Sequence, residues 1–228
     1  MALNTIRLPN GETITIDEWL HWPIFSTIEF GPNIALNLSA FTYVQGQRVP
    51  RQGTLPVGQR NATVADTNMV ARTRMNQDEA FLAYSITYEH YALTAAYADE
   101  DETVLQAPAP AVLAQNLRRL QRDVVVSFKI GAGIDKPQFR APMSWIDQGP
   151  GAPAYTSGDQ PSAGVAVGYG TAGPISPQSQ RQWKLPIYIA SDRVMRLEVK
   201  SAFGAMVDQT QAIRLRWYLD GLKRRPVA

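Results

Sequence analysis

The stretch FLAYSITYEHYAL, residues 81–93, decides the fold class of this chain. Aromatic and β-branched residues dominate it, and these residue types are enriched in β-strands. If the run is extended, alternate side chains share one face, and they are Leu82, Tyr84, Ile86, Tyr88 and His90. The stretch therefore predicts one long strand with a buried face.

Two further runs show the same alternation. In residues 34–40 an apolar side chain recurs at every second position, which is the period of a half-buried strand. In AIRLRWYL, residues 212–219, one face is apolar and the other is charged or aromatic. The segment Gly31-Pro32-Asn33 separates the first run from residues 24–30, so these two strands are candidates for a meander.

The order of the predicted elements indicates an all-β protein. The predicted strands are residues 24–30, 34–44, 81–93, 123–130, 183–189, 194–199 and 212–219. Helices do not alternate regularly with these strands, which disfavours a parallel α/β sheet. We therefore expect an antiparallel β-sandwich of jelly-roll type, with one short helix and long loops.

The helix and the longest loop are easily located. After Pro108 and Pro110, residues 111–120 carry leucines with the i, i+4, i+7 spacing of one helical face. Residues 149–180 hold seven Gly and five Pro, which predicts a long loop.

The ends of the chain differ from its middle. Pro9-Asn10-Gly11 is a turn signal, so we expect a hairpin within residues 6–16. The expected organisation is an N-terminal arm (residues 1–22), a single jelly-roll domain (23–222) that contains the loop 149–180, and a basic C-terminal tail (223–228).

The residue types most used in catalysis are scarce. The chain has no Cys, which excludes disulfide scaffolds, thiolate–zinc sites and thiol catalysis, and it has only His21 and His90. Neither His belongs to a metal-binding spacing, and there is no Gly-x-Ser-x-Gly elbow. We therefore expect no enzyme, no catalytic residue, no metal and no cofactor.

No segment is apolar enough for a membrane span of about 20 residues. The longest aliphatic run near the middle is residues 124–126, and the N-terminal sequence lacks the apolar core of a signal peptide. We expect a protein that is made in the cytoplasm and has no membrane span.

Charge and aromatic residues indicate candidate contact sites. Residues 193–228 contain eight cations and three anions, a balance of +5, whereas the whole chain carries only +2. The cluster Lys223, Arg224 and Arg225 is therefore a candidate contact for nucleic acid or for an acidic neighbouring subunit. In the arm, Trp19 and Trp22 are candidate interface anchors, with packing in the core as the alternative.

Several pieces of the chain follow one another in a distinctive order. They are ADTNM (residues 65–69) leading into FLAYSI (81–86), the Gly/Pro-rich loop, KLPIYI (184–189), VMRLEV (194–199) and IRLRWYLDG (213–221). This order resembles that of the jelly-roll capsid proteins of tailless icosahedral bacteriophages. The resemblance spans most of the chain and rests on strand order and loop character.

The resemblance implies two four-stranded sheets and a role as a structural virion protein, a capsid subunit that self-assembles into an icosahedral shell. It also implies that the partners are other copies of the chain and other virion proteins, and that the protein resides in the virion. At 228 residues the chain suits a single rather than a double jelly roll. The alternative is a carbohydrate- or receptor-binding β-sandwich module of a viral spike, with Tyr155, Tyr169 and Trp145 as its binding platform.

Overall fold

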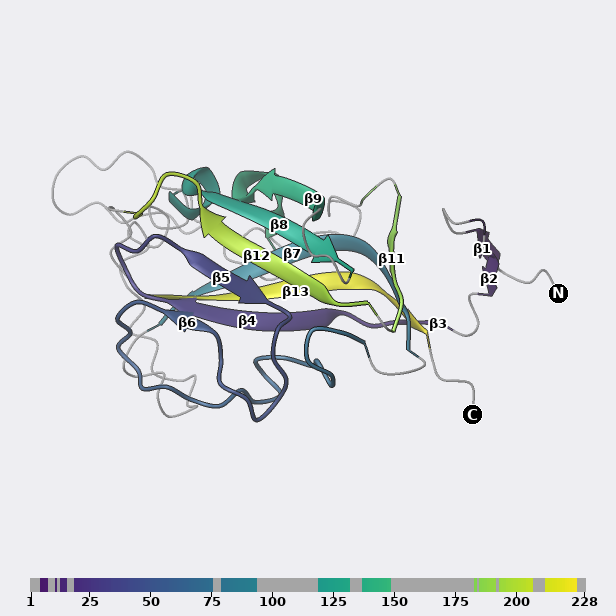
Figure 1. The fold of residues 1–228 in the computed structure, drawn as a ribbon, viewed down its shortest axis with the longest axis horizontal. Coiled ribbons are helices and arrows are strands. Elements are labelled where there is room, and N and C mark those ends of the chain that lie inside the picture. The colour runs from purple at the N-terminus through teal and green to yellow at the C-terminus, as the bar shows by residue number, and fades with distance from the viewer. Residues whose placement is uncertain are drawn as a thin grey trace, which may run out of the picture.

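The computed structural model shows an all-β sandwich of two sheets (Figure 1). The described residues are 5–7, 11, 13–15, 19–75, 79–93, 119–131, 137–148, 183, 185–191, 193–206 and 212–224. The predicted loop 149–180 and most of the predicted helix 111–120 lie outside them. The last two residues of that helix are described and are helical, and the helix continues to residue 123.

Thirteen strands and one short 3₁₀ helix are described. In chain order they are β1 (Thr5–Arg7), β2 (Thr13–Thr15), β3 (Trp19–His21), β4 (Ile24–Phe30), β5 (Asn37–Ala40), β6 (Arg51–Gln52), β7 (Phe81–Ala92), β8 (Val124–Ile130), β9 (Pro137–Pro142), η3 (Met143–Trp145), β10 (Asp147–Gln148), β11 (Ile187–Ile189), β12 (Met195–Ser201) and β13 (Ile213–Arg224).

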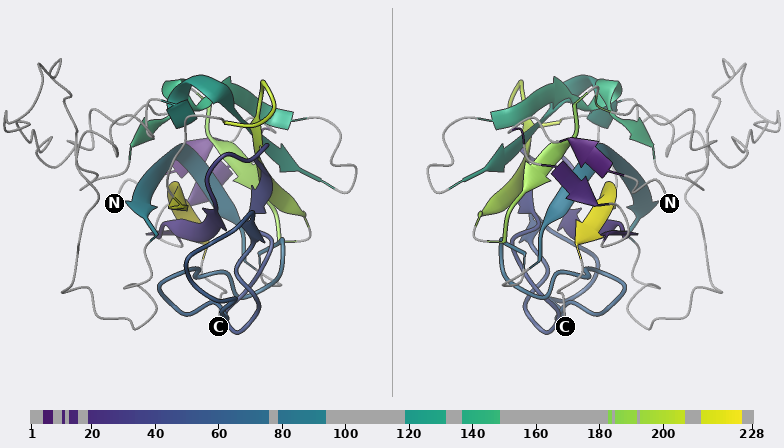
Figure 2. Two further views of the ribbon diagram at one scale, coloured as in Figure 1. Left: turned by 90° about the vertical axis from the view of Figure 1, so that its left-hand side faces the viewer. Right: turned by 90° about the vertical axis from the view of Figure 1, so that its right-hand side faces the viewer.

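The principal strands pair in a nested order, first with last. The antiparallel pairs are β4 with β13, β5 with β12, β7 with β11, and β8 with β9. One sheet has the order β10-β7-β13-β4-β6, with β11 on β7 and β3 on β13, and the other has the order β5-β12-β8-β9. This nesting is what results when a long hairpin is rolled into two facing sheets, and it confirms the jelly-roll sandwich (Figure 2).

The first sheet is wider than the resemblance implies. It has seven strands rather than four, and the other sheet has four. The additional strands β3, β6 and β10 contain only two or three residues each. They extend the edges of the sheet without changing the nested order.

The predicted meander of residues 24–30 and 34–44 is wrong, because β4 and β5 lie in opposite sheets. Gly31 lets the backbone at the end of β4 pass close to the backbone of Thr54, because a Cβ at this position would lie 2.2 Å from the Thr54 carbonyl oxygen. Asn33 follows with a positive φ of 55°. The Gly-Pro-Asn segment is therefore a crossover between the sheets rather than a hairpin turn.

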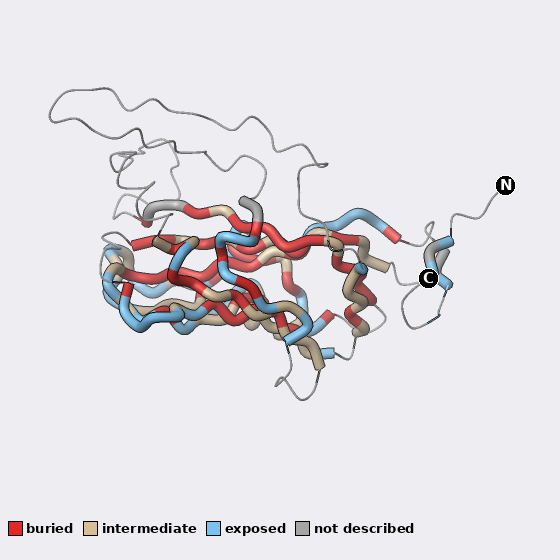
Figure 3. Tube along the Cα trace, turned by 90° about the horizontal axis from the view of Figure 1, so that it is seen from above, coloured by how far each residue is buried: buried red, intermediate tan, exposed pale blue. Residues whose placement is uncertain are grey.

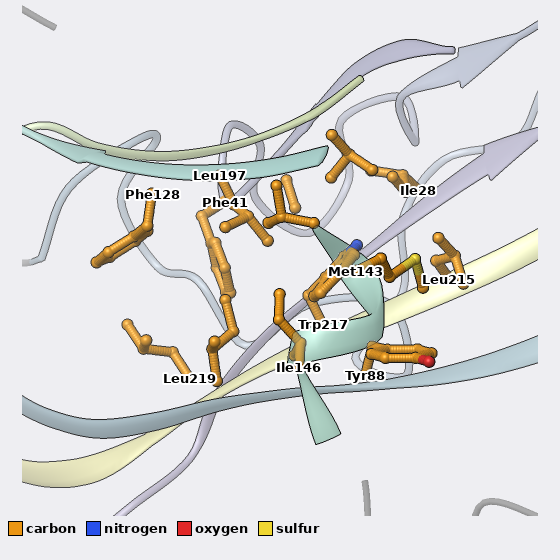
Figure 4. Packing of buried hydrophobic residues seen from close by; sticks show 14 of the residues in the cluster. Ile28, Phe41, Tyr88, Phe128, Met143, Ile146, Leu197, Leu215, Trp217 and Leu219 are labelled. Atoms are coloured by element: carbon orange, nitrogen blue, oxygen red, sulfur yellow. The ribbon is translucent and has the colours of Figure 1, made fainter. Parts of the chain in front are cut away.

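The core lies between the two sheets (Figures 3 and 4). Along β13 buried and half-buried residues alternate, as the sequence predicts for residues 212–219. Trp217 from this strand packs against Tyr88 with ring centroids 5.4 Å apart. Leu197 and Phe128 reach the same core from the four-stranded sheet. Each such side chain stabilises the sandwich by roughly 1.5–3 kcal/mol through burial.

The face predicted for β7 is correct over only part of the strand. Ile86 and Tyr88 belong to the main core, but Leu82 and Tyr84 belong to a separate small cluster. The pairing with β13 shifts at Gly221, where Tyr84 is the extra residue of a β-bulge. A bulge moves the following side chains to the opposite face, which explains the error.

Part of the predicted arm and part of the predicted tail belong to the sheet. Residues 19–21 form β3, which pairs with the end of β13, so that Arg224 faces Trp19 and Lys223 faces Leu20. The N-terminal hairpin predicted within residues 6–16 is confirmed by the pairing of β1 with β2. Figure 1 shows this hairpin beyond the end of the two sheets.

Candidate functional site

One end of the sandwich exposes apolar side chains, and we call it the arm end. Strand β8 ends there, β12 begins there, and β3 pairs with the last residues of β13 there. Leu20, Trp22 and Val70 are exposed at this end, by 37%, 49% and 70%. A large side chain exposed beside two others is typical of a surface that contacts another protein.

The two tryptophans predicted as interface anchors have different environments. Trp19 is 7% exposed and packs against Ala80 and Leu82. It therefore belongs to a small cluster within the chain itself. Trp22 is half exposed and lines a shallow depression with Val70. Of the two, only Trp22 is available to another molecule.

The predicted basic cluster is not a tail over its first two residues. Lys223 Nζ lies 2.7 Å from Glu79 Oε1, so its charge is paired within the sheet. Arg224 is also in β13, and its backbone N–H donates to the carbonyl of Ala80. Arg225 lies outside the described residues. The cluster therefore remains a predicted contact for nucleic acid or for an acidic neighbouring subunit, with two of its residues held in a strand.

A buried carboxylate organises the outer face of the seven-stranded sheet. Glu29 is fully buried, and three guanidinium groups lie around it. Its oxygens are 3.0 Å from Arg51 Nε, 2.8 Å from Arg60 Nη2 and 3.0 Å from Arg214 Nη2. Arg51 and Arg60 come from the long segment 41–75, whereas Arg214 comes from β13. The carboxylate thus fixes that segment onto the sheet.

Asp66 completes this group, which we call the Glu29 cluster. Its carboxylate lies 2.6 Å from Arg60 Nη1 and accepts the backbone N–H of Thr63. Burial acts to raise the pKa of Asp66, but the Arg60 hydrogen bond and its positive charge lower the pKa below its usual value overall. The same hydrogen bond raises the pKa of Arg60. Arg60 and Asp66 are therefore both ionised at neutral pH.

A second polar group lies on the same sheet. The Tyr218 hydroxyl donates to Glu89 Oε2 at 2.6 Å, and Arg216 Nη1 lies 3.8 Å from that oxygen. Burial raises the pKa of Tyr218 to about 12, and the hydrogen bond to Glu89 acts in the same direction. Here too each cation has a carboxylate beside it.

The outer face of the four-stranded sheet differs, because several cations share a single carboxylate. Glu198 lies 3.0 Å from Lys129 Nζ, 2.6 Å from Arg196 Nη2 and 3.2 Å from Lys200 Nζ. Arg140 is exposed on the same face. Burial acts to raise the pKa of Glu198, but the hydrogen bonds from the two lysines lower the pKa overall. We call this surface, with its four cations, the basic face.

An aromatic cleft opens near the arm end, between β11 and the ends of β8 and β9. Its volume is about 840 Å³, and Phe139, Trp183 and Tyr188 are among its lining residues. The rings of Phe139 and Trp183 have centroids 5.9 Å apart. Trp145 is 43% exposed, and its ring lies 5.4 Å from that of Phe139. Tyr155 and Tyr169, the other two residues of the predicted binding platform, lie outside the described residues.

The two histidines lie far apart. His21 is exposed and its Nε2 is 2.8 Å from Asp220 Oδ1. His90 is buried, and burial lowers its pKa to about 4. They face Leu222 and Leu215 on β13, which places them about 23 Å apart along the strand. Within the described ranges, no group of three His, Asp or Glu side chains is arranged to hold a metal ion.

Comparison with protein-family models, with curated proteins and with solved structures finds no match to this chain. No described helix has the length and apolar composition needed to cross a membrane.

Proposed function

We propose that this protein is a structural virion protein, a capsid subunit that assembles with copies of itself into an icosahedral shell. The observation that carries the proposal is the nested pairing of β4 with β13, β5 with β12, β7 with β11 and β8 with β9. Viral shell subunits are one large class of proteins with this jelly-roll order. Its expected location is the virion, after synthesis in the cytoplasm of the host.

The arm end supports the assignment to assembly rather than to catalysis. A fold does not determine a function, so support for assembly has to come from the residues on the surface. Trp22 is a large, half-exposed ring beside exposed Val70, and such rings dominate the energy of protein interfaces. The β1–β2 hairpin lies beyond the sheets, where it is available to a neighbouring subunit (Figure 1).

Particle formation tests the proposal directly. We expect size-exclusion chromatography with light scattering to show large oligomers, and negative-stain microscopy to show closed particles. Trp22→Ser should shift the protein to small species. The matched control is Phe203→Ser, because Phe203 is 81% exposed but follows β12 at the opposite end of the sandwich. A protein that stays monomeric at all concentrations and salt conditions overturns the proposal.

The aromatic cleft favours a second candidate, a carbohydrate- or receptor-binding module of a viral spike. Sugar rings pack on exposed aromatic side chains. Trp145 is 43% exposed and its ring lies 5.4 Å from that of Phe139, which lines the cleft together with Trp183. A glycan array distinguishes the two proposals. Selective binding by a monomeric protein, lost in Trp145→Ala, would favour the module over the shell subunit.

A further inference from the structure

We propose that the basic face of the four-stranded sheet binds the phosphate backbone of nucleic acid. This site differs from the predicted cluster at residues 223–225, and it does not depend on whether the protein forms a shell. Three features of this face favour such binding: its concentration of positive charge, the spacing of its cations and the position of its single carboxylate.

The two outer faces arrange their charges differently. On the seven-stranded sheet and the segment that covers it, the cations in ion pairs share almost as many carboxylates; they are Arg51, Arg60, Arg214, Arg216 and Lys223 with Glu29, Asp66, Glu79 and Glu89. The exposed Arg48, Arg72 and Arg74 add positive charge to that segment outside these ion pairs. On the basic face four cations lie around one carboxylate, a balance of +3; they are Lys129, Arg140, Arg196 and Lys200 with Glu198. The basic face therefore gathers an excess of positive charge on three neighbouring strands.

The geometry of the face suits a polyanion. Arg196 and Lys200 are four residues apart on β12, which is about 13 Å along the strand. Lys129 on β8 and Arg140 on β9 widen the patch across two more strands, each about 4.8 Å from the next. A duplex carries one phosphate per about 3.4 Å of helix axis on each strand, so a patch of this length can contact several phosphates.

The polar residues between the cations support phosphate contact rather than base recognition. One row across the sheet places Ser39, Glu198, Ser127 and Arg140 side by side. The two hydroxyls are donors of the kind that contact phosphate oxygens. Among the described residues of this outer face none is aromatic, so it has no platform for stacking bases. The expected binding is therefore independent of sequence and sensitive to salt.

Replacing Glu198 should change the affinity for nucleic acid in the opposite direction, because it adds to the positive charge of the face. The carboxylate holds three cations in place but also removes one unit of charge from the face. In Glu198→Gln the balance of the face rises from +3 to +4. A polyanion should therefore bind more tightly to this variant, and its binding should depend more steeply on salt.

The experiment is fluorescence anisotropy with a labelled 30-nucleotide single strand and a labelled 20-base-pair duplex, titrated with the unassembled subunit between 50 and 200 mM salt. In Arg140→Gln/Lys200→Gln we expect affinity at 100 mM salt to fall by about tenfold or more. The slope of log K against log salt should fall by about 1.4–1.8, since each phosphate contact contributes about 0.7–0.9. Both replaced side chains lie on the solvent side of the sheet, and circular dichroism checks that each variant is folded.

A matched control removes the same charge from another surface. Arg48 and Arg74 are exposed in the segment 41–75, so Arg48→Gln/Arg74→Gln should bind as the unchanged protein does. Equal losses in both double variants would mean that net charge, not this face, attracts nucleic acid, and would overturn the proposal.

Two other results would also overturn it. One is unchanged binding in Arg140→Gln/Lys200→Gln. The other is the absence of nucleic-acid binding together with binding of the peptide YADEDETV, residues 97–104 of this chain, that is lost in the same variant. That last result would assign the basic face to the acidic segment of a second copy.

Discussion

Replacing Glu29 by Gln tests how the long segment 41–75 is held to the sandwich. The change keeps the volume and shape of the side chain but removes the charge at the centre of the Glu29 cluster. The balance of that cluster rises from +1, three arginines with two carboxylates, to +2. Because Glu29 is fully buried, water cannot replace the lost negative charge.

The expected loss of stability follows from the exposure of the partners. The side chains of Arg51 and Arg214 are only 10% and 15% exposed, so they remain buried beside a neutral amide. Removing one member of a buried ion pair costs about 3–5 kcal/mol. Arg60 keeps its contact with Asp66, which places the expected loss near the lower value, about 3 kcal/mol. For a chain of this length that corresponds to a fall in Tm of about 6–12 °C.

Urea unfolding of the subunit, followed by circular dichroism and by tryptophan fluorescence, measures this loss. Glu198→Gln is the matched control, since Glu198 also contacts three cations. Two of its partners, Arg196 and Lys200, are 32% and 51% exposed and can turn to water. Only Lys129, at 17%, is as covered as the partners of Glu29, so we expect a loss of about 1 kcal/mol. A Glu29→Gln variant that loses no more free energy than Glu198→Gln would refute the reasoning.

Three further changes have defined outcomes. Burial lowers the pKa of His90 to about 4, so the unfolded chain binds a proton below pH 6.5 that the folded protein excludes. Between pH 7 and pH 5 the free energy of unfolding should therefore fall by about 2 kcal/mol more in the unchanged protein than in His90→Gln. Urea titrations at both pH values measure this difference. A Cβ on Gly221 would lie 2.2 Å from the Leu82 carbonyl oxygen, so Gly221→Ala should cost about 2 kcal/mol or more by the same assay, whereas Gly58→Ala, with open space around it, should cost little. Trp19→Ala should lower the stability of the subunit by about 3 kcal/mol or more, whereas Trp22→Ser should leave it unchanged; equal effects would mean that the arm end is misassigned.

The sequence predicts those parts of the fold that depend on local alternation. The period of two in residues 212–219 places Trp217 in the core because β13 is regular over that run. In β7 the same reasoning fails at Tyr84, where a bulge opposite Gly221 inserts one residue. The bulge depends on the register between two strands that begin 132 residues apart in the chain, and no local pattern contains that information.

A local pattern also cannot predict which strands pair when the partners lie far apart in the sequence. The turn residues after β4 are compatible with a hairpin, but β5 finds its partner in β12, at the far end of the chain. The aromatic cleft shows the same limit, since the fold brings Phe139 and Trp145 close to Trp183, which lies far from them in the sequence. No spacing in the sequence could have identified them as one group.

The basic segment at residues 193–228 shows how the fold redistributes charge over the surface. Along the chain its cations read as a single charged region, yet strand pairing divides them between two sheets. Arg214 and Lys223 meet Glu29 and Glu79, which lie far away in the sequence. Arg196 and Lys200 share Glu198 with Lys129 and remain in excess. A cluster of cations attracts nucleic acid only where carboxylates do not offset its charge. The stronger candidate for phosphate binding is therefore the face of the four-stranded sheet rather than the end of the chain.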